Sequence, residues 1–262
     1  MDEAESPLLL KIEQAVAVVT LNRPHVLNAI DEEMAQALLK AIECIAEDGT
    51  ARALLLHGEG RAFCAGGDVA RFLDGDPTKA VAAILNPFHD GLKALAELGI
   101  PTIAAIQGAV AGGGLSLALA CDFCIASEDA ILSTAYARIG ASPDGSLTYV
   151  LPRIVGPRKA LELISLAQPI RADAAVRLGL VTRVVAPDAL QAEAATFARK
   201  MSEGPTAAYA RIRALIDDSL AQDLPTQLDR ERDALLAGTR TEDFVEGVRA
   251  FLSKRPARFE GR

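Results

Sequence analysis

Residues 106–122 read IQGAVAGGGLSLALACD, and this stretch carries the clearest structural signal in the chain. It ends a β-like apolar run that starts at Thr102, breaks at Gly108 and at three successive glycines, and resumes as a short helix-like run. A strand, a glycine turn and a buried helix N-terminus leave backbone N–H groups unpaired at the positive end of the helix dipole. Because glycine has no side chain, another molecule can approach that backbone closely. The stretch predicts an anion or oxyanion site, with a tight packing turn as the alternative.

A second glycine loop favours the site over the simple turn. Residues 61–68 read RAFCAGGD; they also follow an apolar strand, residues 53–57, and also end in glycines before an acidic residue. The first loop lacks both the G-x-G-x-x-G spacing of a dinucleotide site and the Gly-Lys-Ser/Thr of a P-loop. The two loops therefore indicate a different kind of site.

Composition narrows the class of protein. Half of the 262 residues are hydrophobic, enough for one large domain, or for one domain with an appendage. A net charge of −8 without a long basic run argues against a nucleic-acid partner. No apolar run reaches the roughly 18 residues of a membrane span, and residues 1–6 lack the pattern of a signal peptide. We expect a cytoplasmic protein with no membrane partner.

Cysteines and histidines do not predict a metal or redox centre. Cys121 and Cys124 have the spacing of such a pair, but no second pair follows and the surrounding run is apolar. We expect buried, reduced thiols. His25, His57 and His89 show no spacing typical of a metal site, and His89–Asp90 lacks a matching nucleophile.

Periodicity predicts an α/β chain that becomes all-helical near residue 205. Residues 8–12 and 16–21 read as a hairpin, and Asp31 caps a helix that ends at Gly49. Residues 71–78 read as a mobile loop. Further strands are expected at residues 102–106, 123–126, 131–132 and 181–185, and further helices at 80–98 with a kink near Pro87, 115–120, 147–154, 160–166, 172–178, 190–201, 206–220, 227–236 and 241–251.

The two glycine loops resemble the enoyl-CoA hydratase/isomerase (crotonase) superfamily. In that family R-A-F-C-A-G-x-D and x-G-x-A-x-G-G-G-x-x-L-A-x-x-C-D lie about fifty residues apart, as here. The resemblance covers nearly the whole chain, including residues 20–24, 27–29, 151–156, 171–175, 178–181 and 246–256. It implies a crotonase-like spiral of ββα units over residues 1–204, which carries the acyl-CoA site. It also implies a helical region over residues 205–262 that builds a homotrimer or a hexamer of two trimers.

The resemblance also implies the chemistry of the two loops. The backbone N–H groups of Gly67 and Gly113 would form an oxyanion hole that grips the thioester oxygen of an acyl-CoA. Donors fixed in place stabilise the enolate formed when a neighbouring proton leaves. Coenzyme A is then part of the substrate, and no separate cofactor or metal is expected.

The acid–base residues depart from the hydratase pattern. Hydratases carry two glutamates where this sequence has Ser116 and Tyr136, and neither residue supplies a carboxylate. Hydration needs one group to orient water and another to handle the proton at the α-carbon. We therefore expect little or no hydratase activity, with Ser116 and Tyr136 shaping the acyl pocket or simply filling space.

One carboxylate remains, at Asp144 in the turn of residues 143–146. Isomerases of the family, including those of the phenylacetyl-CoA pathway, carry a single acid in this loop, and one acid suffices for a 1,3-proton shift. Apolar neighbours such as Leu147, Val150 and Leu151 would raise its pKa from about 3.9 and make it a better base. The alternative is structural, because Pro-Asp-Gly is a good turn.

Contacts with coenzyme A follow from the resemblance. Ala62, Ala65 and Asp68 flank the loop over which the coenzyme A arm runs, and Arg23 lies near the phosphates or is a surface charge. Phe251 and Lys254 are placed where a neighbouring subunit's tail reaches the nucleotide. Residues 71–87 are expected to line the acyl pocket.

These residues predict an enzyme of fatty acid or related acyl-CoA metabolism. It would move a double bond from the 3- to the 2-position, or rearrange a ring-derived thioester, with Asp144 as acid and base. The alternatives are a hydratase-like lyase with unusual acid–base residues, a non-catalytic CoA-binding protein, and nucleophilic catalysis by Asp144. The last resembles the aromatic dehalogenases, which use a Trp that this chain lacks.

Overall fold

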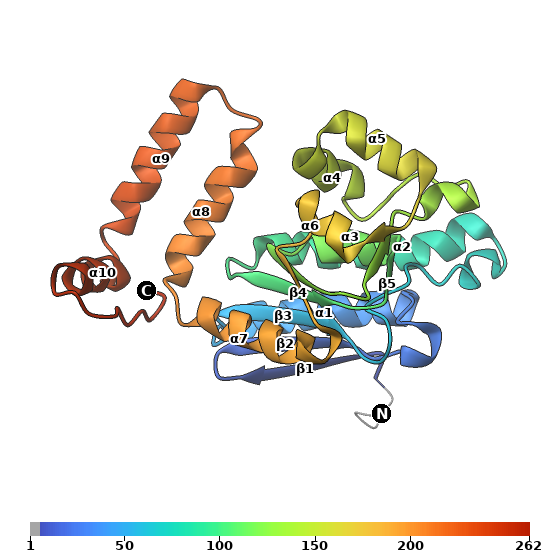
Figure 1. The fold of residues 1–262 in the computed structure, drawn as a ribbon, viewed down its shortest axis with the longest axis horizontal. Coiled ribbons are helices and arrows are strands. Elements are labelled where there is room, and N and C mark those ends of the chain that lie inside the picture. Colours follow the sequence, from blue (N-terminus) through green and yellow to red (C-terminus); the bar gives the residue numbers. More distant parts are fainter. Residues whose placement is uncertain (1–5) are drawn as a thin grey trace.

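The computed structural model describes residues 6–262, so the expectation about the acidic start of the chain falls largely outside the described residues. Two sheets organise the fold (Figure 1). The larger has the order β1-β2-β3-β4-β6-β9 and the smaller the order β5-β7-β8. The strands are β1 Leu8–Glu13, β2 Val16–Leu21, β3 Ala53–Gly58, β4 Thr102–Ile106, β5 Ala109–Ala111, β6 Phe123–Ser127, β7 Ile131–Ser133, β8 Ile170–Arg171 and β9 Arg183–Val185.

The helices begin and end close to the predicted signals. Asp31 accepts a hydrogen bond from the Met34 N–H and caps α1, which Gly49 ends in the left-handed conformation. The helices are α1 Glu32–Asp48, α2 Pro77–Glu97, α3 Gly113–Leu119, α4 Leu147–Val155, α5 Pro157–Leu166, α6 Ala172–Arg177, α7 Leu190–Ser202, α8 Thr206–Ser219, α9 Leu224–Gly238 and α10 Glu242–Leu252.

A ββα unit repeats along the chain, as predicted. β1 and β2 form the antiparallel hairpin before α1, and the other pairings of the larger sheet are parallel. β4 joins the larger sheet, β5 joins the smaller one, and α3 follows; β6, β7 and α4 repeat this order. The spiral of ββα units is therefore confirmed, and the β4–β5–α3 and β6–β7–α4 units each carry the chain from the larger sheet to the smaller one.

Some local predictions were wrong. β5 lies inside the stretch read as a glycine turn, and β8 lies where only helices were expected. Strands of two or three residues are too short to show a period. Arg71–Leu73 forms a short 3-10 helix rather than a loop, and Asp76 caps α2, which begins at Pro77.

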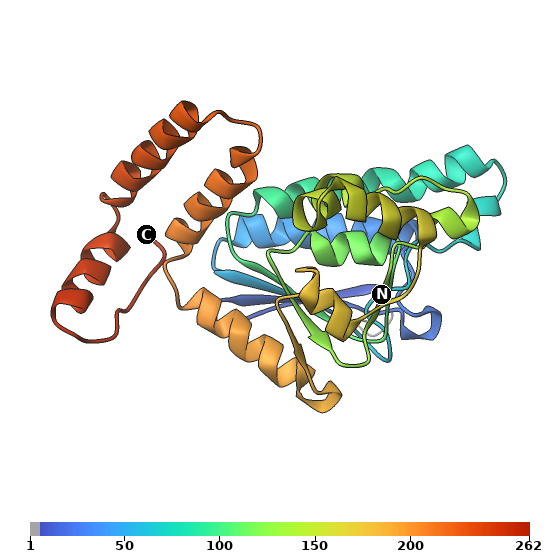
Figure 2. The same cartoon turned by 45° about the horizontal axis from the view of Figure 1, so that its top comes forward.

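Helices cover both faces of the larger sheet (Figure 2). Alternate residues of β3 point to opposite faces. Leu55 packs in the cluster with α7, and Leu54 and Leu56 pack in the cluster that includes α1 and α3. The carboxyl ends of β3 and β4 lead directly into the two glycine loops, so the core fixes the position of both.

The chain after residue 204 stands away from the sheets. α8, α9 and α10 project to one side of the two-sheet body (Figures 1 and 2). They expose large apolar side chains at Ile212, Ile216, Leu220, Leu224, Leu228, Leu235 and Leu236. The division at 204/205 and an oligomerising role for the second part stay predictions. Among residues 6–262, no helix has both the length and the apolar character needed to span a bilayer.

Candidate active site

The two glycine loops lie against each other. Cys64 N–H donates to the Ala109 carbonyl (3.1 Å), and Ala111 N–H donates to the Cys64 carbonyl (3.0 Å). A Cβ atom on Gly66 would lie 2.8 Å from the Ala111 oxygen, and one on Gly114 would overlap the Cys64 carbonyl. Only glycine permits this approach, so the glycines serve first to bring the loops together.

Each loop presents a free backbone N–H. Ile30 bonds to the residues on either side of Gly67, accepting from the Asp68 N–H and donating to the Gly66 carbonyl, each at 2.8 Å. In this parallel pairing the N–H of Gly67 itself faces away from Ile30. Gly113 is the first residue of α3, where an N–H has no acceptor within the helix. Across the described residues, neither N–H finds a hydrogen-bond acceptor.

Two aromatic rings wall this region. A Cβ atom on Gly67 would lie 2.9 Å from the Phe72 ring, and one on Gly113 would lie 3.7 Å from the Phe88 ring. Rings of this kind exclude water and lower the local dielectric, which strengthens hydrogen bonds to a developing negative charge. The sequence prediction assigned residues 71–87 to the acyl pocket without singling out either ring. The apolar pair Ile84 and Phe88, four residues apart on α2, was the sequence signal that could have identified the Phe88 ring.

Asp144 lies in the loop before α4. Hydrogen bonds with three other segments hold this loop in place. The Tyr136 hydroxyl donates to Asp144 Oδ1 (3.0 Å), and the Ser116 hydroxyl donates to the Asp144 carbonyl (3.0 Å). The Ser116 and Tyr136 hydroxyl oxygens are 3.2 Å apart. On the far side, the Gly145 N–H donates to His89 Nε2 (3.3 Å).

The surroundings tune this carboxyl group. Burial raises the pKa of Asp144, while the Tyr136 hydrogen bond and the nearby His89 lower it in part. Burial also raises the pKa of Tyr136, and the Asp144 charge adds to the effect, so the phenol stays protonated. Leu147 and Leu151, predicted as apolar neighbours, are buried in the core, and Val150 is half-buried. The arrangement supplies one basic carboxylate and one permanent hydroxyl donor.

The structure brings Ser116 to the Asp144 backbone carbonyl and Tyr136 to the Asp144 carboxylate. The sequence prediction had placed both side chains on the acyl pocket or treated them as filler. Both hydroxyls form hydrogen bonds with Asp144, and both residues are buried. Their role in the acyl pocket stays a prediction. Neither contact could be found from spacing alone, because 28 and 8 residues separate the partners along the chain.

Arg23 is occupied by carboxylates of its own chain. Its guanidinium pairs with Asp31 (2.8 Å) and Asp68 (3.5 Å), and its side chain is only 14% exposed. This pairing fixes the 61–68 loop and already compensates the arginine charge. Ala62 is buried and Ala65 half-buried in the same loop. The predicted coenzyme A contacts of Arg23, Ala62, Ala65 and Asp68 stay predictions.

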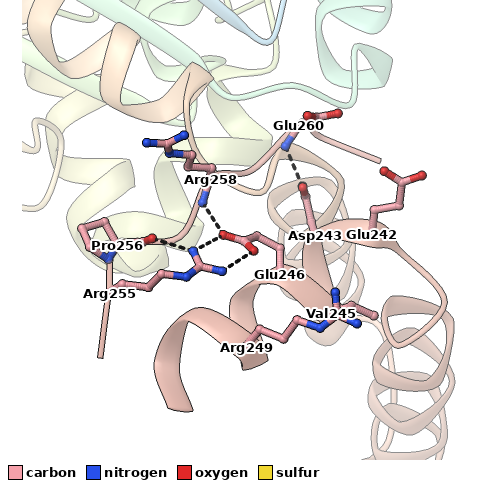
Figure 3. A pocket seen from close by; sticks show the side chains of 9 residues that line it. All are labelled: Glu242, Asp243, Val245, Glu246, Arg249, Arg255, Pro256, Arg258 and Glu260. Atoms are coloured by element: carbon pink, nitrogen blue, oxygen red, sulfur yellow. Dashed lines mark hydrogen bonds and ion pairs between the residues drawn. The ribbon is translucent and has the colours of Figure 1, made fainter. Parts of the chain in front are cut away.

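A separate cleft of about 870 Å³ lies beside α10 (Figure 3). Glu246 accepts two hydrogen bonds from Arg255 (2.6 and 2.8 Å), and Asp243 accepts from the Glu260 N–H (2.7 Å). These groups satisfy one another and join α10 to the end of the chain.

Phe251 and Lys254, predicted to reach a neighbour's nucleotide, are exposed at the end of α10. Within residues 6–262, no three His, Cys, Asp or Glu side chains are grouped as metal ligands.

Comparison with known proteins identifies the family. The enoyl-CoA hydratase/isomerase family model matches residues 11–262. A "Probable enoyl-CoA hydratase" of Rhodobacter capsulatus is 38% identical, covering 96% of this chain and 97% of the relative. The 1,2-epoxyphenylacetyl-CoA isomerase of Escherichia coli K12 is 36% identical, covering 97% and 98%. The crystal structure of an enoyl-CoA hydratase from Bacillus anthracis is 31% identical, with a TM-score of 0.91 over 98% of this chain and all of the other. The chain belongs to the enoyl-CoA hydratase/isomerase family and has the crotonase fold.

Proposed function

We propose that this protein is an acyl-CoA isomerase that uses Asp144 as its single acid and base. It moves a double bond from the 3- to the 2-position of an enoyl-CoA, or rearranges a ring-derived CoA thioester. The observation that carries the proposal is the carboxylate of Asp144, half-buried and bound by Tyr136 at a place where two hydroxyls replace the hydratase glutamates. The Escherichia coli relative is named as an isomerase.

The reaction uses the two parts of the site in turn. The N–H groups of Gly67 and Gly113 bind the thioester oxygen, and the Asp144 carboxylate removes a proton from C2. The electrons move onto the thioester oxygen, where the two N–H groups stabilise the enolate. Asp144, now protonated, returns the proton to C4, and the double bond then lies between C2 and C3. No atom enters or leaves, so one carboxyl group is enough.

Hydration is the second candidate, because the Rhodobacter capsulatus relative is described as a hydratase. It would need Ser116 and Tyr136 to orient water, but both hydroxyls are engaged with Asp144. A non-catalytic role is left as an outcome of the test.

The test compares wild type with Asp144→Asn on a 3-enoyl-CoA and a 2-enoyl-CoA by absorbance. We expect wild type to isomerise the 3-enoyl-CoA, and Asp144→Asn to lose about 10²–10⁴-fold in kcat, the scale of general acid–base catalysis. Rapid hydration of the 2-enoyl-CoA by both proteins would make Asp144 a turn residue and favour the hydratase. Tight acyl-CoA binding without turnover would favour the non-catalytic role.

We also propose that α8–α10 build a homotrimer or a hexamer. The exposed apolar side chains of α8 and α9, Ile216 and Leu220 among them, support this assembly. Native mass spectrometry tests it: wild type is expected as a trimer or hexamer, and Ile216→Lys with Leu220→Lys as smaller species. A monomeric wild type would contradict the proposal.

A further inference from the structure

Resting on the proposed function, we infer that Tyr136 is a positioning residue: its hydroxyl holds one oxygen of Asp144 and leaves the other to meet the substrate. Tyr136 donates to Oδ1 at 3.0 Å, and none of the described residues bonds to Oδ2. A carboxylate held at one oxygen keeps one rotamer, so the proton is removed and returned along a fixed path.

The ring of Tyr136 is itself fixed in place. The residue is buried at 7% exposure and begins a short 3-10 helix, Tyr136–Ile139, after Ala135 in the left-handed conformation (φ 59°). A Cβ atom on Gly112 would lie 4.0 Å from the ring, so the phenol packs against the turn that presents the Gly113 N–H. One rigid side chain thus bonds the carboxylate and lies beside the turn of the second loop.

Few charged groups lie close to the Asp144 carboxylate. Tyr136 faces the carboxyl from the 3-10 helix and His89 approaches from α2. Ser116 of α3 is uncharged and bonds the backbone carbonyl of Asp144, not its carboxylate. No lysine or arginine forms an ion pair with Asp144 among residues 6–262. The Tyr136 hydroxyl is therefore the direct hydrogen-bond donor that stabilises the ionised carboxylate.

A hydroxyl suits this role better than the glutamate it replaces. A carboxylate this close to Asp144 would repel its charge, and the two groups would then share a proton. The phenol donates a hydrogen bond and, because its own pKa is raised, adds no charge. The site keeps one titrating acid, as a proton shuttle between two carbons requires.

The test is the pH–rate profile of Tyr136→Phe with the 3-enoyl-CoA. Loss of the hydroxyl destabilises the ionised form of Asp144, so the acid limb moves to higher pH, by about one pH unit for one hydrogen bond to a charged group. We expect the plateau kcat to fall about tenfold because the carboxylate gains freedom, with KM within about twofold. Tyr149→Phe, which removes an exposed hydroxyl from α4, should reproduce the wild-type profile.

A second variant moves the profile in the opposite direction. Replacing Tyr136 by 3-fluorotyrosine gives a more acidic phenol and a stronger hydrogen bond, and the acid limb should move to lower pH. If both profiles overlay that of wild type, or kcat falls equally at every pH, Tyr136 only fills space and the inference is wrong. Asp144→Asn separates the two claims: an active Asp144→Asn overturns the proposed function, whereas a dead one beside unshifted Tyr136 variants overturns the positioning role alone.

Discussion

The ionised Asp144 carboxylate is useful as a catalytic base but lowers the stability of the folded protein. Burial raises its pKa above the value in an unfolded chain. Between those two values the native state binds more protons than the unfolded state, so the free energy of unfolding falls as pH rises through that range. At pH values above that range the carboxylate is ionised in both states, and its burial lowers stability.

Replacing this carboxylate should therefore stabilise the protein while it removes activity. We expect Asp144→Asn to raise Tm by about 2 °C at pH 8, since the amide still accepts the Tyr136 hydrogen bond without a buried charge. The gain should shrink as pH is lowered to 4, because the wild-type carboxyl takes up a proton and loses its buried charge. Calorimetry at both pH values checks this, with exposed Asp90→Asn as the control. A lower Tm at pH 8 would mean that the charge is not destabilising.

For single residues of the candidate site, the sequence identified which residues matter but not which atoms they contact. Ser116, Tyr136 and Asp144 could be singled out, because each lies in or beside a recognisable motif. Their hydrogen bonds depend on how α3, the 3-10 helix and the α4 loop meet, and a left-handed Ala135 shows in no periodicity. The Arg23 ion pairs were missed for the same reason, since Asp68 lies 45 residues further along the chain.

The element that depends most on close contact is α3. Gly114, in its first turn, lies where a Cβ atom would overlap the Cys64 carbonyl and come within 2.7 Å of the Cys64 Cβ. Gly91 in α2 is a helical glycine whose added Cβ would make ordinary van der Waals contact, the nearest at 3.4 Å, without overlap. Replacing glycine by alanine is therefore expected to lower stability in α3 and to raise it in α2.

We expect Gly114→Ala to lower the free energy of unfolding by about 2–3 kcal/mol through overpacking, and to reduce activity by separating the glycine loops. Gly91→Ala should raise stability by about 0.5–1 kcal/mol, because alanine favours the helix. Urea unfolding of both variants, with kcat measured alongside, is the check. Equal effects would show that propensity, and not loop contact, governs α3.

Elements with long patterns were predictable from sequence. The β1–β2 hairpin and the Asp31 cap of α1 were placed correctly, because alternation and capping are local. β5 and β8 were not, since two or three residues carry no period and their pairing with β7 joins distant segments. The 3-10 helix Arg71–Leu73 was read as part of a loop because Gly75 and Pro77, which are typical of turns, follow it closely.

Over the whole molecule, two arginines tie the C-terminal helices to the body. Arg213 of α8 pairs with Asp122 (3.1 Å), which also accepts hydrogen bonds from Thr102. Arg52 donates to the carbonyls of Gly204 (2.7 Å) and Phe259 (3.0 Å). The change to an all-helical pattern near residue 205 was visible in the sequence, but these tethers were not, because they join segments up to 207 residues apart.

Removing one tether should have a pH-dependent effect. Burial raises the pKa of Asp122 and Arg213 lowers it, so Arg213→Ala leaves a partly buried carboxylate without its cation. We expect a loss of about 1–2 kcal/mol at pH 8 and less at pH 5, where the carboxyl takes up a proton more readily. Denaturation at both pH values tests this, and Arg177→Ala, in an exposed pair with Asp173, should change little. A loss independent of pH would point to packing alone.

The four cysteines should differ sharply in reactivity. Burial raises the pKa of Cys64 and Cys121 to about 12 and that of Cys124 further, whereas Cys44 is exposed on α1. At pH 8 we expect one fast thiol per chain with a disulfide reagent, and three more after urea. Cys44→Ser should abolish the fast phase. Two fast thiols in the native protein would contradict the burial of Cys64, Cys121 and Cys124.

The free N–H groups of Gly67 and Gly113 belong to the main chain, and no substitution at those positions other than proline can delete them. Heritable variation at this site therefore falls on the side chains at positions 116, 136 and 144. If these N–H groups bind a thioester oxygen as proposed, a descendant could acquire a different carboxylate there and still bind the same oxygen. New reactions can arise by single steps that each preserve substrate binding, a route closed to sites whose polarising groups are themselves side chains.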